Sequence, residues 1–193
     1  PNAATVGLDS GITGASMLRG VKPEARIQID GMSYDIGGLI GQEEYAYLRR
    51  EWIDSLACDP AAFQYTHYEH GATQAPFAWK RVRHAPDLPW PAPGMRLSLH
   101  FAAPAESLLA GLGVAVCYEL YDGIPLLCKW LEVHNHSGRS VRLNTFVGEI
   151  LAAVEGEVSV DSPSQWTYPD IHVASDYAGH GMPPPRANAT PGW

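Results

Sequence analysis

Apolar and polar residues alternate along the second half of the chain with the period of a β-strand. Residues 95–101, 114–120 and 127–133 place an apolar side chain at almost every second position. These apolar residues are Met95, Leu97, Leu99, Phe101, Val114, Val116, Tyr118, Leu120, Leu127, Leu131 and Val133. Because successive side chains of a strand point to opposite sides of the sheet, each stretch predicts a strand with one face in a core.

Two turns join these stretches into a predicted three-stranded meander. Asp122-Gly123 is a hairpin signal, and a loop of two or four residues there keeps the apolar residues of 114–120 and 127–133 on one face. A three-residue loop at 136–138 predicts a third strand over 141–147, paired with 127–133. Lys129 opposite Thr145 is then the exception on the apolar face. The opposite face would pair Glu132 with Arg142, Trp130 with Asn144, and Cys128 with Phe146.

The first half of the chain predicts fewer elements. Residues 26–31 and 77–84 indicate strands, and apolar residues at helical spacing predict a short helix within 43–56. The sequence therefore predicts an all-β fold, an antiparallel β-sandwich with one short helical insert. We expect a loose lead-in over residues 1–22, the sandwich over 23–175, and an extended tail over 176–193 that leads to a downstream region.

Charge and hydropathy argue against two classes of partner. The chain has a formal net charge of −8 and a pI near 5.4, and phosphate recognition needs clustered Lys and Arg, so we expect no nucleic-acid partner. No stretch reaches the ~18–20 apolar residues of a membrane span, so we expect no membrane partner. No signal peptide is visible, which leaves two locations open, the cytoplasm or secretion with the signal removed.

The three cysteines form neither a zinc motif nor a disulfide framework. Cys117 and Cys128 are expected on one sheet face, directly opposite with a two-residue loop and one pairing step apart with a four-residue loop. A directly opposed, hydrogen-bonded pair suits a disulfide poorly, so we expect free thiols. We expect no cofactor.

The central hairpin resembles a known family. Residues 116–135 read Val-Cys-Tyr-Glu-Leu-Tyr-Asp-Gly-Ile-Pro-Leu-Leu-Cys-Lys-Trp-Leu-Glu-Val-His-Asn. This run resembles the strand–turn–strand signature of N-terminal domains in α-galactosidase-like (melibiase) glycoside hydrolases, and Val141-Arg142-Leu143 and residues 146–152 occupy the places that follow it. The resemblance covers residues 78–160. It implies a β-supersandwich of the galactose-mutarotase-like type, normally joined to a (β/α)₈ catalytic barrel.

No catalytic residue is assigned. Retaining glycosidases need two carboxylates ~5 Å apart, usually on a barrel of ~200–250 residues, and the strand pattern leaves no room for one. His67 and His70 stand three positions apart, as on a helical metal site, but no third ligand is evident nearby. We therefore expect solvated loop histidines and no metal. A mutarotase-type acid–base pair using His100, His134 or His172 is an alternative that the short chain disfavours.

Aromatic side chains carry the remaining hypotheses, because sugars stack on flat, dry rings. Candidate carbohydrate contacts are Trp166, Tyr168, Asp170 and Trp79. Candidate interface residues, on the mixed polar and aromatic face of the meander, are Tyr121, Trp130 and Phe146.

Two functional hypotheses result. The first is an accessory N-terminal β-sandwich domain of a glycoside hydrolase that packs on the catalytic barrel and lends a loop to the sugar site. Its partners would be carbohydrate and its own downstream catalytic domain, and a homo-oligomer is left open. The alternative is a stand-alone carbohydrate-binding or interaction module without an enzyme.

Overall fold

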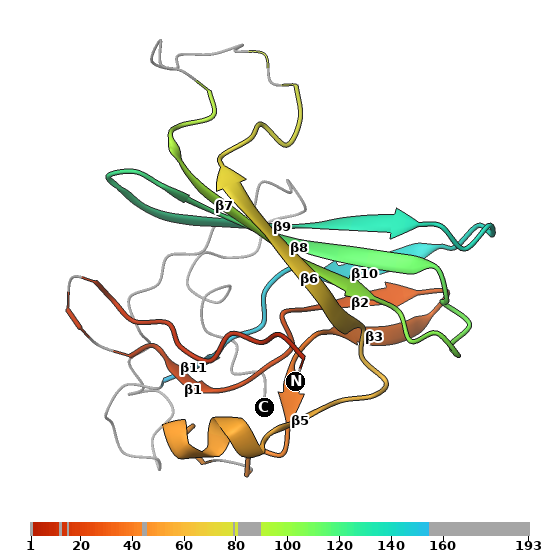
Figure 1. The fold of residues 1–193 in the computed structure, drawn as a ribbon, viewed down its shortest axis with the longest axis horizontal. Coiled ribbons are helices and arrows are strands. Elements are labelled where there is room, and N and C mark those ends of the chain that lie inside the picture. Colours follow the sequence, from red (N-terminus) through yellow and green to blue (C-terminus); the bar gives the residue numbers. More distant parts are fainter. Residues whose placement is uncertain are drawn as a thin grey trace, which may run out of the picture. The chain divides into compact units, whose positions relative to one another are not determined.

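The computed structural model describes residues 2–11, 13–14, 16–43, 46–78, 80 and 90–154 (Figure 1). In this part of the chain, strands and turns dominate, and a 3₁₀-helix, η1 (Arg50–Ser55), is the only helix. The all-β prediction is therefore confirmed. Two compact units form: unit 1 comprises Pro1–Ala4, Pro23–Leu39 and Ala57–Ile150, whereas unit 2 comprises Thr5–Lys22, Ile40–Leu56 and, among the described residues, 151–154.

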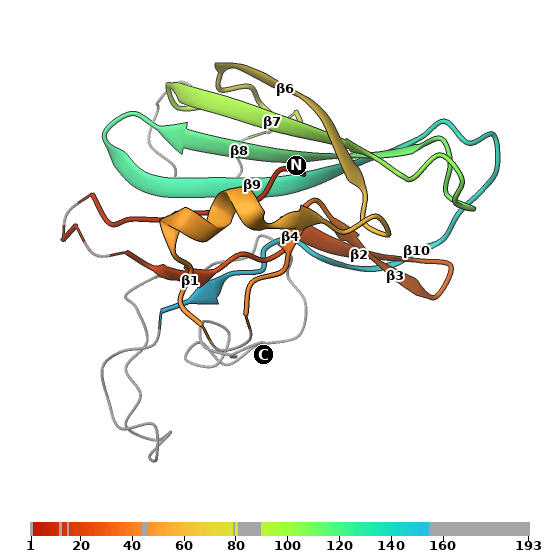
Figure 2. The ribbon, with the colours of Figure 1, turned by 60° about the horizontal axis from the view of Figure 1, so that its bottom comes forward.

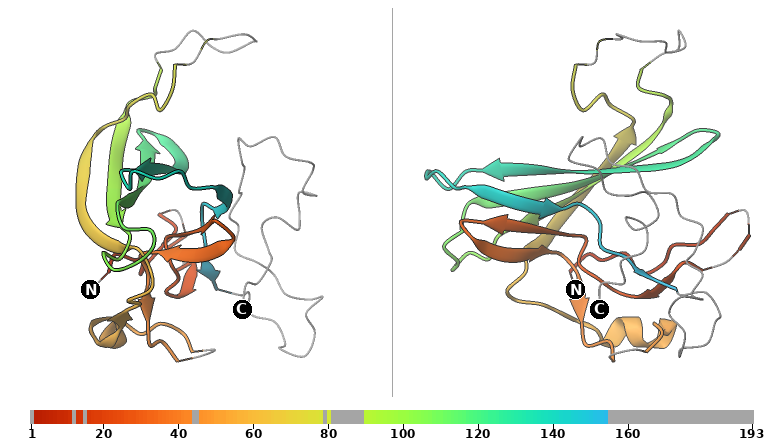
Figure 3. Two further views of the ribbon diagram at one scale, coloured as in Figure 1. Left: turned by 90° about the vertical axis from the view of Figure 1, so that its right-hand side faces the viewer. Right: turned by 180° about the vertical axis from the view of Figure 1, so that it is seen from behind.

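Unit 1 is a sandwich of two antiparallel sheets that face each other (Figures 2 and 3). The first has the order β6-β7-β8-β9, with β6 (Gln64–Ala72), β7 (Gly94–Ala102), β8 (Leu112–Tyr121) and β9 (Ile124–Asn135). The second has the order β10-β2-β3, with β10 (Leu143–Val147), β2 (Ala25–Ile29) and β3 (Met32–Ile36). Two short strands, β4 (Leu39–Ile40) and β5 (Ala57–Cys58), pair where the chain leaves unit 1 and returns to it.

The core of unit 1 lies between these sheets and follows from strand alternation. Ile27 and Ile29 of β2 point inward, as do Val114 and Val116 of β8. The whole cluster comprises Ala25, Ile27, Ile29, Ile36, Phe63, Phe101, Ala103, Leu109, Leu112, Val114 and Val116. Burial of one Val, Ile or Phe side chain stabilises the fold by ~1.5–3 kcal/mol, so this cluster is the main apolar contribution to stability.

The β8–β9 hairpin adopts the register expected for a four-residue loop. Val116 lies opposite Leu131 and Leu120 opposite Leu127, and a bulge after Leu120 tightens the turn. The predicted apolar face is not buried beside the turn, where Leu120 and Leu127 are exposed. Cys117 and Cys128 are one pairing step apart on the opposite face, Cys117 opposite Trp130 and Cys128 opposite Glu119, and all three cysteines are free.

The third strand predicted over 141–147 forms as β10, but its predicted pairing with 127–133 is wrong, because β10 pairs with β2 in the other sheet instead of with β9. Polar groups at the β2–β3 turn select this partner. Asp30 exchanges two 2.9 Å hydrogen bonds with the backbone of Arg142, and Gly31 N–H donates to the side chain of Asn144 at 2.9 Å. The pairs predicted across β9, Glu132–Arg142, Trp130–Asn144 and Cys128–Phe146, are therefore not formed.

The turn that supplies these groups is a two-residue hairpin. Asp30 and Gly31 have φ values of 49° and 85°, the left-handed region that such turns require. Glycine enters it without strain, and aspartate is among the few other residues that tolerate it. The strand predicted over 26–31 is thus confirmed as β2 followed by this turn.

The helix predicted within 43–56 shortens to the six residues of η1. Arg49 before it is extended and gives no side-chain cap, and no residue of η1 is buried. Helices of this length need burial or capping to form, so the apolar spacing alone was insufficient. Residues 77, 78 and 80 of the strand predicted over 77–84 are not in a strand, and the other residues of that stretch lie outside the described part.

Unit 2 is held together by backbone pairing and one amide side chain. β1 (Leu18–Gly20) pairs with β11 (Ala152–Ala153). The side chain of Gln42 donates to the carbonyl oxygens of Arg19 and Ala46 and accepts from Val21 N–H at 2.9 Å. β1 is buried although it lies within the predicted lead-in of residues 1–22. Among the described residues there is no helix long and apolar enough to cross a bilayer.

Lys129, the exception on the apolar face, points into the sandwich and forms a buried ion pair. Its ammonium group donates to the Glu24 carbonyl at 2.6 Å and lies 3.6 Å from the Glu24 carboxylate and 3.0 Å from Glu149. The Tyr118 hydroxyl donates to the same Glu24 carboxylate, and the ammonium sits 4.9 Å from the Tyr118 ring centroid. The side chains of Lys129 and Glu24 are only 8% and 2% exposed.

Replacing Lys129 with Met should lower the free energy of unfolding by ~3–5 kcal/mol, because the Glu24 carboxylate would stay buried without its cation. Urea denaturation measures the change. The exposed Lys80 gives the control Lys80→Met, for which we expect less than about 0.5 kcal/mol. The double variant Glu24→Gln/Lys129→Met should regain part of the loss. Equal stability of Lys129→Met and the parent protein would contradict this role.

Candidate functional site

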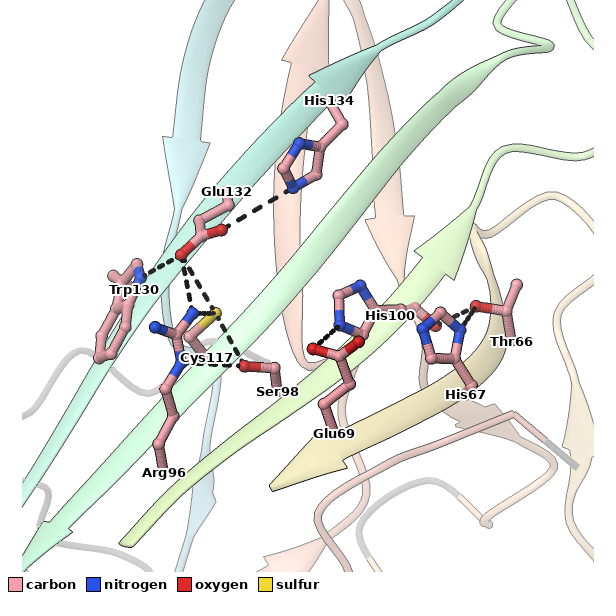
Figure 4. A network of polar contacts seen from close by, with 10 residues as sticks. All are labelled: Thr66, His67, Glu69, Arg96, Ser98, His100, Cys117, Trp130, Glu132 and His134. Atoms are coloured by element: carbon pink, nitrogen blue, oxygen red, sulfur yellow. Dashed lines mark hydrogen bonds and ion pairs between the residues drawn. The ribbon is translucent and has the colours of Figure 1, made fainter. Parts of the chain in front are cut away.

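The outer face of the four-stranded sheet, turned away from the core, carries a concentrated group of polar and ionisable side chains. Alternation places them there from all four strands. The outer face includes His67, Glu69, Arg96, Ser98, His100, Ala115, Cys117, Glu119, Tyr121, Cys128, Trp130, Glu132 and His134. Two polar clusters form on it, one centred on Glu132 and one on His100 (Figure 4).

Glu132 is the centre of the first cluster. Its Oε1 accepts hydrogen bonds from Arg96 Nη2 at 3.0 Å, from Trp130 Nε1 at 3.0 Å and from Cys117 Sγ at 3.6 Å. Its Oε2 lies 3.8 Å from His134 Nε2. Figure 4 shows these groups converging on one carboxylate from two neighbouring strands and from Arg96 on a third. Trp130 and Glu132 reach each other because residues i and i+2 of a strand share a face.

Arg96 is fixed by contacts on several sides. Its guanidinium lies 5.1 Å from the Trp130 ring centroid, and its Nε donates to Ser98 Oγ at 3.1 Å. Only 19% of its side chain is exposed. A guanidinium stacked on an aromatic ring and paired with a carboxylate is rigid, so the cluster presents its polar atoms in fixed directions.

This environment lowers the pKa of Glu132. The main cause is the hydrogen bond from Trp130, and the positive charge of Arg96 acts in the same direction, whereas partial burial opposes both. The carboxylate is therefore ionised at neutral pH. It is suited to accept hydrogen bonds and is a poor general acid.

Glu119 and Tyr121 form a structural pair beside this cluster. Glu119 is 2% exposed and accepts from the backbone N–H of Gln74 at 3.0 Å and from the Tyr121 hydroxyl at 2.9 Å. Burial and the hydrogen bonds to Cys128 and Glu119 raise the pKa of Tyr121. The Glu119 carboxylate is satisfied by these two donors and therefore stabilises the sheet, although its sequence position gave no sign of burial.

The second cluster consists of His67, Glu69 and His100. The two imidazole rings stack with centroids 4.3 Å apart and planes 2° from parallel, and Glu69 Oε2 lies 3.8 Å from His100 Nε2. One ligand atom from each residue lies within 4.8 Å of the other two. In the described part of the chain these are the residues whose side chains could share a metal ion.

The residues proposed from the sequence are only partly brought together. Tyr121 and Trp130 lie on the outer face, but Phe146 lies on β10 in the other sheet and is 57% exposed. The candidate carbohydrate contacts Trp79, Trp166, Tyr168 and Asp170 are outside the described residues.

Sequence reasoning missed Arg96 and Glu69, and it assigned Glu132 to the wrong arginine. Arg96 alternates with Met95 and Leu97, so its outward direction could be predicted, but its neighbours depend on the order β7-β8-β9. The histidines 67 and 70 were expected in a loop, whereas they lie in β6.

No protein-family model, no curated protein sequence and no solved structure matches this chain.

Replacing Trp130 with Phe removes the indole donor and keeps an aromatic ring, so the pKa of Glu132 should rise toward the ordinary value of ~4.3. Because the native pKa of Glu132 lies below its unfolded value, the ionised carboxylate stabilises the fold above the unfolded pKa, and this stability is lost as the pH falls through the native pKa. The pKa shift is smaller in Trp130→Phe, so this variant should lose less stability on acidification. Carbon-13 NMR titration of the carboxyl group measures the change. Trp52→Phe, in η1, is the control, and an unchanged Glu132 pKa in Trp130→Phe would disprove the assignment.

Proposed function

We propose that this chain is an accessory β-sandwich domain of a glycoside hydrolase and that it binds carbohydrate on the outer face of sheet β6-β7-β8-β9. The observation that carries the proposal is the half-buried network of Arg96, Trp130 and Glu132 on that face. The resemblance of residues 116–135 to α-galactosidase-like N-terminal domains suggests α-galactosides as the class of sugar.

The network suits a neutral, hydroxyl-rich ligand. A sugar hydroxyl both donates and accepts, so it can bond to a carboxylate and a guanidinium at the same time. Oε1 of Glu132 is already occupied by three donors, whereas the polar group found near Oε2 among the described residues is His134, at 3.8 Å. An indole ring adds the flat apolar surface on which sugars stack. Because the groups are fixed before binding, little conformational entropy would be lost on association.

The apolar row at one end of the sheet supports an accessory role. Met95, Leu120 and Leu127 lie side by side on β7, β8 and β9, on the core side of the sheet. They are 63%, 57% and 45% exposed, which means that the second sheet does not cover them. A contiguous exposed apolar group of this kind is typical of a protein–protein contact. We assign this row to the contact with a catalytic domain.

Isothermal titration calorimetry with melibiose and longer α-galactosides tests the sugar site. Trp130→Ala and Glu132→Gln should each weaken binding at least about tenfold, or ~1.4 kcal/mol. Trp52→Ala, which removes a partly exposed tryptophan in η1, should leave the affinity unchanged. Lack of binding to any neutral oligosaccharide, or equal affinities of Trp130→Ala and the parent protein, would refute the proposed site.

The 193-residue chain should bind such sugars without cleaving them. Retaining hydrolysis needs a protonated acid and a nucleophile ~5 Å apart, and the Glu132 network holds one carboxylate, kept ionised by its donors. Incubation with 4-nitrophenyl α-galactoside should therefore release nitrophenol no faster than buffer alone. Turnover that disappears in Glu132→Gln would instead show that the sheet face is a complete active site.

A further inference from the structure

We propose that His67, Glu69 and His100 form a binding site for a zinc-class divalent metal ion on strands β6 and β7. The site is separate from the proposed sugar-binding network, and neither needs the other to exist. It uses two imidazole nitrogens and one carboxylate oxygen, a ligand set that zinc takes readily, with a further position left for water.

A β-bulge creates the site. In a regular strand, residues two positions apart share a face, so Tyr65 and His67 would point the same way. The register shifts between them, and as a result Tyr65 pairs with Phe101 and packs against it in the core, whereas His67 pairs with His100 on the outer face. Glu69, two residues after His67, then joins the same face. Bulges often redirect side chains in this way beside functional sites.

The residue added by the bulge holds the first ligand in place. Thr66 Oγ1 donates its single proton to the His100 carbonyl oxygen at 3.0 Å, so it accepts from the Nδ1–H of His67, also at 3.0 Å. This hydrogen-bond pattern assigns the proton of His67 to Nδ1 and leaves Nε2 with a free lone pair. A hydroxyl that orients an imidazole through its second nitrogen is typical of the outer shell of a metal site.

His100 provides the second, independent observation. Its Nε2 is buried and has no hydrogen-bond partner within the described part of the chain, although buried polar atoms are nearly always satisfied. The nearest carboxylate oxygen, Oε2 of Glu69, is 3.8 Å away, beyond hydrogen-bond distance. A metal ion shared with Glu69 would satisfy this nitrogen.

The spacing of the three side chains is compatible with coordination. Ligand atoms around a tetrahedral zinc ion lie about 3.3–3.6 Å from one another, given bonds of ~2.0–2.2 Å. The ligand atoms here are within 4.8 Å of one another, and binding requires the exposed His67 ring to turn out of its parallel stack on His100 so that the two nitrogen lone pairs converge on the ion. Glu69 is 72% exposed and is free to rotate as well.

Zinc titration of the chelator-stripped 193-residue chain tests the site, with calorimetry for affinity and Co²⁺ absorption for ligand geometry. We expect saturable one-to-one binding of Zn²⁺ and visible Co²⁺ bands. Each of His67→Gln, Glu69→Gln and His100→Gln should weaken Zn²⁺ binding by about 100-fold or more. Thr66→Val should weaken it by ~10–100-fold and alter the Co²⁺ spectrum, whereas Thr66→Ser should retain both.

His70→Gln is the matched control, because His70 lies on the same strand with its side chain on the opposite face. His136→Gln tests binding by the stacked pair His134 and His136, whose ring centroids are 6.5 Å apart. Circular dichroism verifies that each variant is folded, and the exposed position of His67 makes His67→Gln the safest substitution. The proposed metal site would be overturned by an absence of saturable Zn²⁺ binding or by an unchanged Zn²⁺ affinity in His67→Gln. An equal loss of affinity in His70→Gln or His136→Gln would overturn it as well. Sugar binding that is retained in His67→Gln would show that a failure of the proposed metal site leaves the proposed sugar-binding function intact.

Discussion

The buried pair of Lys129 and Glu24 is the constraint on which the arrangement of unit 1 depends. Charged groups inside a sandwich are tolerated only if each has its partner in place, so this pair penalises every packing that separates β9 from the segment before β2. A slip of one residue between β8 and β9 would turn Lys129 outward and bring Trp130 and Glu132 toward the core. The charge pair inside the sandwich and the polar network outside therefore specify the same register.

The strands with strict alternation could be predicted from the sequence, and those selected by distant polar contacts could not. The faces of β8 follow from Val114 and Val116, whose apolar side chains have one direction in which they can be buried. The partner of β10 depends instead on Asp30 and Asn144, which are far from each other in the sequence. The same apolar pattern fits beside β9 as well as beside β2, so periodicity alone does not decide which of these two strands pairs with β10.

The candidate site was predictable to a smaller extent, because a sheet assembles it from residues of several strands. Trp130 was identified as a residue of the outer face, and its alternation was sufficient for that. The contact of Glu132 with Arg96 requires the order of β7, β8 and β9, which a single sequence does not encode locally. The spacing of His67 and His70 suits a helix, but the segment is a bulged strand in which His67 pairs with His100 instead.

The bulge at Thr66 also affects how such chemistry could spread among proteins. Neighbouring side chains of a regular strand point to opposite faces of the sheet and do not contact each other. At the bulge, Thr66 and His67 are hydrogen-bonded, so two adjacent codons encode a proposed metal ligand and the side chain that orients it. Together with Glu69 they lie within one four-residue segment of β6, which is an edge strand of its sheet. An edge segment can be exchanged without disturbing the inner strands, and the receiving sheet would need to supply only one histidine on the adjacent strand. A short insertion into an edge strand could therefore transfer these proposed ligands to an unrelated sandwich.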